Sequence, residues 1–255
     1  MHQSPAVGRA LPLVGDVLWI SECFPIGDIH EHVSIYLIRA GEHNIIIDSG
    51  SFYHRTSIER KIREATAERG VHALIVSHSD YPHSGNIEAF RREWGDFDIY
   101  ASCGDPQIQG LPYAKQCRIG GSEQVFGRRF SFIDPPLADR SHTSWIFDHA
   151  SHVLFAADGF GHYHRPGECE QLSSDFDTGI RAADIHDFHH DNIGWLRYVD
   201  PVKFRHKLER MFATFDAVAV APIHGNPIMR AELPAYVDDL VDAAARIAAG
   251  YVVGG

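Results

Sequence analysis

Residues of metal-binding types stand beside short apolar runs at several places in the sequence: His78, Asp80, His83, His142, Asp158 and His224. Imidazole nitrogens and carboxylate oxygens are common protein ligands of transition-metal ions. The first three share one polar loop between an apolar run and an amphipathic segment, and such a loop can direct several side chains at one point. A lone histidine beside a strand is usually a loop or core residue, but the joint pattern predicts a metal centre.

Short strands alternating with helices would position these residues. Apolar runs of strand length predict β-strands at 17–20, 34–38, 44–47, 73–76, 97–101, 129–133, 144–147, 153–156 and 217–221. Apolar residues at helical spacing predict helices around 58–65, 87–94 and 237–244, and Asp200 before Pro201 predicts a capped helix start. The two similar halves of this pattern favour sheets packed together with helices outside.

The stretch 159–200 has weak periodicity, so we expect an irregular insert with one helix near 178–188. Its histidines are expected mainly in a solvated loop, although they could line the pocket or complete the metal site: His162, His164, His186, His189 and His190. No repeat or low-complexity tract divides the chain. We therefore expect residues 1–255 to form a single domain.

The order and type of these motifs resemble the metallo-β-lactamase fold, and within it the oxygen-binding di-iron branch represented by flavodiiron proteins. The resemblance extends from about Trp19 to about Ile228. The loop 78–83 reads His-Ser-Asp-Tyr-Pro-His, where the superfamily has His-x-His-x-Asp-His and the di-iron branch has Glu in place of the second His. The resemblance implies the α/β (α+β) class, with an αββα metallo-β-lactamase-like sandwich and a metal site at one edge.

The resemblance also implies a set of ligands for two metal ions. One ion would be held by His78, Asp80 and His142, and the other by His83 and His224, while Asp158 would bridge the two. Supporting residues near the ions would be drawn from His32, Tyr81 and Asp48. Pro82 departs from the family pattern because it stands where an aspartate serves the second ion. The second site would therefore be weaker, more open, or completed by another residue.

Asp80 in place of an imidazole adds a hard oxygen donor, which favours iron, with zinc or manganese as alternatives. The expected function is that of a non-haem di-iron oxidoreductase, which binds and reduces or activates O2 or NO at a carboxylate-bridged dinuclear site. One alternative is a zinc-dependent hydrolase of the same fold that acts on an ester, lactone or thioester. The other is a metal or gas sensor without turnover.

Flavodiiron proteins carry a flavodoxin domain after the metal domain, whereas this sequence ends at Gly255. We therefore expect no flavin on this chain, and electrons would come from an external electron-donor protein or from an organic substrate. We also expect a homo-oligomer.

The composition limits the partners and the cellular compartment. With 23 Lys and Arg against 34 Asp and Glu, the net charge of −11 disfavours nucleic acid and membrane surfaces as partners. The apolar run 11–20 is interrupted by Asp16 and has no basic leader, so it predicts neither a signal peptide nor a spanning helix. We expect the protein in the cytoplasm.

The cysteines are widely separated in the sequence and include no Cys-x-x-Cys pair: Cys23, Cys103, Cys117 and Cys169. This spacing argues against a disulfide framework and against a zinc site made of neighbouring thiolates.

Overall fold

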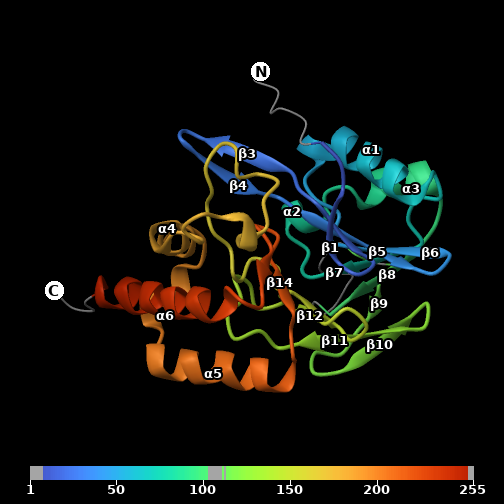
Figure 1. Cartoon of the computed structure of the whole chain (residues 1–255). Helices are drawn as coiled ribbons and strands as arrows, with labels where there is room; N and C mark the ends of the chain where they lie inside the picture. The colour runs from blue at the N-terminus through green and yellow to red at the C-terminus, as the bar shows by residue number, and fades with distance from the viewer. Residues whose placement is uncertain (1–7, 103–110, 112, 252–255) are drawn as a thin grey trace.

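The structure is a computed structural model that describes residues 8–102, 111 and 113–251. Two β-sheets pack against each other, and helices cover their outer faces (Figure 1). This arrangement confirms the expected αββα sandwich. Cys103 lies outside the described residues.

The first sheet contains seven strands in the order β1-β2-β5-β6-β7-β8-β9. The bounds of its strands are β1 Leu11–Val14, β2 Val17–Ile20, β5 Ile35–Ala40, β6 His43–Ile47, β7 Ala73–Val76, β8 Asp98–Ala101 and β9 Lys115–Gln116. Its outer face is covered by α1 (Arg55–Thr66) and α3 (Ile87–Trp94) (Figure 1). The short elements η1 (Phe52–His54) and α2 (Tyr81–Ser84) lie in its connections.

The second sheet contains six strands in the order β10-β11-β12-β13-β14-β15. The bounds of its strands are β10 Ser122–Val125, β11 Arg128–Ile133, β12 Trp145–Asp148, β13 Val153–Phe155, β14 Ala219–Ala221 and β15 Ile228–Met229. Its outer face packs against helices in the last third of the chain: α4 Ala182–Asn192, η3 Gly194–Tyr198, α5 Pro201–Thr214 and α6 Leu233–Ala249. A separate hairpin is formed by β3 (Cys23–Ile26) and β4 (Ile29–His32), and η2 spans Ser173–Asp175.

Alternate residues of the central strands enter different cores, because successive side chains of a strand point to opposite faces of the sheet. In β6, Ile45 and Ile47 join the core between the sheets, whereas Ile46 packs under the helices of the first sheet. Both faces of this strand are therefore buried, which explains its run of three isoleucines. Between the sheets, the rings of Tyr36 and Phe155 lie 5.2 Å apart, centroid to centroid.

The expected strands are present with boundaries that differ by at most two residues. The Asp200 side chain accepts hydrogen bonds from the N–H groups of Val202 and Lys203, which confirms the predicted cap of α5. The insert's helix is α4, which begins four residues later than expected and runs to Asn192. Among the described helices, none combines the length and the apolar character needed to cross a membrane.

The strands without a prediction are β1, β3, β4, β9, β10 and β15. Most of them are edge or hairpin strands with polar or exposed residues, such as β10, which reads Ser-Glu-Gln-Val. Pairing with a neighbouring strand stabilises these segments, and their own hydrophobic pattern is too weak to indicate a strand.

Candidate metal centre

Loops at the ends of four strands converge on the candidate metal centre. His78 and His83 follow β7 of the first sheet, while Asp158 and His224 follow β13 and β14 of the second. Because β13 and β14 are parallel, their carboxyl ends lie at the same sheet edge. His142 precedes β12, which runs antiparallel to β13, and it therefore approaches the same edge.

Asp158 lies at the junction of three imidazoles. Its Oδ1 is 2.9 Å from Nε2 of His83, and 3.8 Å from Nε2 of both His78 and His224. The rings of His78 and His83 lie 3.8 Å apart, centroid to centroid. The ligand atoms of His78, His83 and Asp158 all lie within 4.8 Å of one another, which is close enough for them to share metal ions.

Unsatisfied polar atoms show that this group of residues fits a cation. Nε2 of His78, Nε2 of His83 and Oδ1 of Asp158 are buried, and none makes a well-angled hydrogen bond to a described residue. Buried polar atoms without such partners are rare in proteins because losing hydration costs free energy. Metal ions bound between these atoms would satisfy all of them.

The opposite ring nitrogens of two histidines are held by hydrogen bonds. Nδ1 of His224 donates to the backbone oxygen of His32 at 2.8 Å and lies 3.0 Å from Oε1 of Glu31. Nδ1 of His83 lies 2.9 Å from Oδ2 of Asp48. Such contacts orient a ring and direct its Nε2 at the metal.

Asp48 is itself rigidly placed. It is fully buried at a φ of 58°, and its carboxylate accepts hydrogen bonds from the N–H and the hydroxyl of Ser77, each at 2.8 Å. Aspartate and asparagine tolerate this left-handed conformation better than most residues. Asp48 therefore holds His83 in place, in line with the supporting position that the family resemblance implies for it.

The charges of the centre interact strongly. Burial by itself lowers the pKa of His83, but Asp48 and Asp158 outweigh it and raise that pKa to about 10. Burial would raise the pKa of Asp158, but His83 and His224 hold it well below its usual range. Burial, together with the charge of His83, lowers the pKa of His78 to about 4. In the metal-free protein, a proton on His83 thus balances the Asp158 carboxylate, and a metal ion would compete for the same atoms.

Asp80 and His142 lie at the periphery of the centre. Asp80 belongs to a second group with His78 and Asp139, and its carboxylate accepts a hydrogen bond from Arg140 at 2.9 Å. The ring of His142 is 6.0 Å from that of His78, centroid to centroid, and its Nε2 lies 3.4 Å from the Ser79 hydroxyl. His142 thus stands beside the compact group rather than within it.

Asp139 is a carboxylate that the sequence analysis did not single out. Its side chain is 5% exposed, Oδ2 lies 3.5 Å from Nε2 of His78, and Oδ1 accepts a hydrogen bond from the Thr143 hydroxyl. Its place three residues before His142, in the same polar segment, is the only sequence signal for it. It adds a third carboxylate to the surroundings of His78.

Other candidates lie away from the metal centre or have structural contacts. The Tyr81 ring is half exposed and contacts Phe52. His162, His164 and His189 are buried, so the expectation of a solvated loop is wrong for them. They are buried because the insert packs against the rest of the chain: Asn226 N–H, in the loop after β14, donates to His162. Within α4, Nδ1 of His189 donates to the backbone oxygen of Ile185. His190 is exposed and His186 is partly exposed, as expected.

Replacing Asp48 with asparagine tests its support of His83. We expect the Asp48→Asn protein to bind metal about 10- to 100-fold more weakly, because an amide cannot supply the negative charge beside Nδ1 of His83. Competition with a coloured chelator measures the affinity. Asp98→Asn, at a half-exposed ion pair with Lys115, is the matched control and should bind metal like the unaltered protein. Equal affinities for all three proteins would contradict the supporting role.

Comparisons with known proteins agree with this architecture. Residues 29–194 match the sequence profile of the metallo-beta-lactamase superfamily. A curated relative, the coenzyme F420H2 oxidase of Methanocaldococcus jannaschii, is 24% identical over 143 residues, which cover 50% of this chain and 33% of the relative. The chain therefore spans about a third of that relative's length.

Several solved structures have the same fold. The rubredoxin oxygen:oxidoreductase of Desulfovibrio gigas superimposes with a TM-score of 0.76 at 14% identity, covering 93% of this chain and 62% of that chain. A flavoprotein of Thermotoga maritima gives a TM-score of 0.71 at 18% identity, covering 89% and 58%. A fragment from Nostoc sp. PCC 7120, described as diflavin flavoprotein A 5, gives 0.74 at 12% identity, covering 95% and 97%. At these identities the likeness shows the fold.

Proposed function

Because the chain belongs to the metallo-β-lactamase superfamily, we propose that its metal centre holds two iron ions and that the protein is an oxidoreductase of O2 or NO. The names of similar proteins support this proposal, since they include an F420H2 oxidase and a rubredoxin oxygen:oxidoreductase. Electrons would reach the centre from a separate donor protein or from an oxidisable organic substrate.

The number of carboxylates around His78 is the observation that carries the proposal. Asp158, Asp139 and Asp80 each lie in a group of potential ligands with this histidine. Carboxylate oxygens are hard donors, and a mixture of imidazole and carboxylate suits iron or manganese better than a set dominated by imidazole or thiolate. Their negative charge would also stabilise ferric iron relative to ferrous iron.

The residues divide into two sets around Asp158. His78, with Asp80, His142 and Asp139 nearby, would hold one ion, and His83 and His224 would hold the other, with Asp158 between them. When bound, iron would supply the redox chemistry and open coordination positions for O2 or NO. The protein contributes orientation through Asp48 and Glu31, and burial of His78 and His83 limits the access of water to their ring nitrogens.

Gas consumption by the iron-loaded protein tests the proposal. We expect the reduced, iron-loaded protein to consume O2 or NO faster than metal-free protein when an electron donor is supplied, as measured with a gas electrode. A protein that retains only zinc, consumes neither gas and hydrolyses esters or lactones would instead be a hydrolase. Full iron loading without turnover of any reductant would favour a sensor.

Pro82 gives a second test. It stands at the start of α2, next to His83, and its side chain has no atom that can bind a metal. We expect Pro82→Asp to raise the occupancy of the second ion, because it adds a carboxylate oxygen between Asp80 and His83. Metal content per chain, measured at limiting iron, reports the change. Pro82→Ala is the matched control, since it removes the same φ restriction without adding a donor. Equal metal content in the two variants would contradict the explanation.

A further inference from the structure

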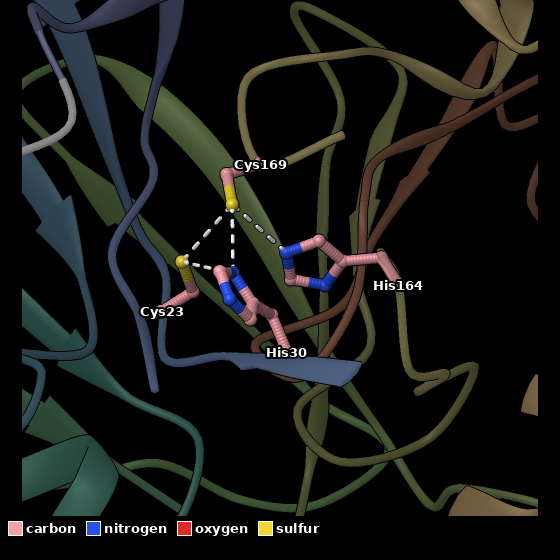
Figure 2. Close-up of side chains that lie close together, drawn as sticks. All are labelled: Cys23, His30, His164 and Cys169. Atoms are coloured by element: carbon pink, nitrogen blue, oxygen red, sulfur yellow. Dashed lines mark hydrogen bonds between the residues drawn. The ribbon is translucent and has the colours of Figure 1, made fainter. Parts of the chain in front are cut away.

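A second group of metal-binding side chains lies where the β3–β4 hairpin meets the insert. Cys23 and His30 come from the two strands of the hairpin, and His164 and Cys169 come from the insert (Figure 2). Their ligand atoms all lie within 4.8 Å of one another. The two cysteines are 146 residues apart in the sequence, so their pairing leaves no Cys-x-x-Cys pattern.

The separations of these atoms are close to those of a tetrahedral zinc site. Zinc–sulfur bonds of about 2.3 Å and zinc–nitrogen bonds of about 2.0–2.1 Å place two sulfurs about 3.8 Å apart, and a sulfur and a nitrogen about 3.6 Å apart. The two sulfurs here are 3.2 Å apart, and Cys169 Sγ lies 3.1 Å from His30 Nδ1 and 3.3 Å from His164 Nε2. Cys23 Sγ lies 3.6 Å from His30 Nδ1. An outward shift of about 0.5 Å or less would admit the ion.

The backbone already holds the four residues in place. His30 and His164 exchange two backbone hydrogen bonds, of 2.7 and 3.0 Å. The backbone oxygen of Cys169 accepts a hydrogen bond from the Ser21 hydroxyl and lies 3.1 Å from Nε2 of His32. The His32 ring also stacks on that of His164, with centroids 3.8 Å apart. The four side chains would therefore lose little conformational freedom when they bind an ion.

Donor chemistry separates this group from the first metal centre. It offers two sulfurs and two imidazoles and no carboxylate, a soft set that suits zinc.

We propose that one Zn2+ ion is bound in a closed, tetrahedral site by Cys23, His30, His164 and Cys169. The ion joins the hairpin to the insert where an isolated backbone pair and the contacts of His32 already connect them. Strand β4 also carries Glu31 and His32, which contact Nδ1 of His224. The zinc ion therefore has a structural role, and it also stabilises the strand that contacts His224 of the first metal centre. This proposal does not depend on the reaction proposed for that centre.

Cobalt substitution of the unaltered protein tests the site directly. We expect one equivalent of Co2+ per chain to produce the near-ultraviolet absorption of a thiolate-bound, tetrahedral ion, and Zn2+ to abolish it. No cysteine belongs to the first metal centre, so this absorption reports the Cys2His2 site alone. Asp158→Asn should keep it, which separates failure of this proposal from failure of the proposed oxidoreductase. Absence of the absorption from the unaltered protein would overturn the zinc site.

Single substitutions identify the ligands. Cys169→Ser should abolish the cobalt–thiolate absorption and lower the zinc content by one ion per chain. Cys117→Ser is the matched control, because Cys117 lies in the core between the sheets and belongs to neither group of metal-binding side chains, and it should keep both signals. If Cys169→Ser fails to fold, X-ray absorption of the zinc-loaded unaltered protein should still show sulfur neighbours at about 2.3 Å. A Cys23–Cys169 disulfide in protein purified without oxidant, detected by mass spectrometry, would overturn the proposal.

Discussion

Asp158→Asn should lower the metal content of the purified protein below one ion per centre, and gas consumption should fall at least about 100-fold. Loss of residues that merely support ligands already costs about 10- to 100-fold in metal affinity or activity, and Asp158 is placed as a ligand itself. Its Oδ1 is the atom that approaches Nε2 of His78, His83 and His224 together. An amide has no charge to balance two cations, so both sites weaken at once.

Metal analysis and a gas electrode measure the two effects in the same preparation. Asp187→Asn, a solvent-exposed change on α4, is the matched control and should preserve both metal content and gas consumption. An Asp158→Asn protein with a full complement of metal and unchanged turnover would show that this carboxylate does not bridge the ions.

Arg128→Leu should lower the free energy of unfolding by about 3–5 kcal/mol. The side chain is nearly buried and bridges two carboxylates, Asp148 in the second sheet and Asp16 in the turn between β1 and β2 of the first. Asp148 is fully buried, and removing the guanidinium would leave its charge without a cation. Loss of one partner of a buried ion pair is costly because the other charge stays desolvated.

Urea denaturation of the metal-free protein measures this loss without a contribution from metal binding. Arg129→Leu is the control, since the neighbouring Arg129 is exposed and should change stability by only about 0.5 kcal/mol. Similar losses in the two variants would mean that Arg128 contributes through general charge rather than through the buried pair.

The sequence alone determined the layered fold and the principal positions of the candidate centre. Strands such as β7 and β14 are continuous apolar runs, as expected of strands that are buried on both faces, and candidate ligands follow soon after each of them. The start of α5 was equally predictable, because its Asp200 cap and Pro201 act through local backbone geometry.

Only the tertiary structure decided which polar side chains meet. The strand bounds place Asp139 and His142 near one sheet edge, but the path of their connecting loop brings Asp139 to His78 and leaves His142 at the periphery. Likewise, Cys23 and Cys169 meet because the hairpin and the insert pack together. Periodicity reports which face of an element is buried, whereas contacts between distant loops depend on the packing of the whole chain and leave no local pattern in the sequence.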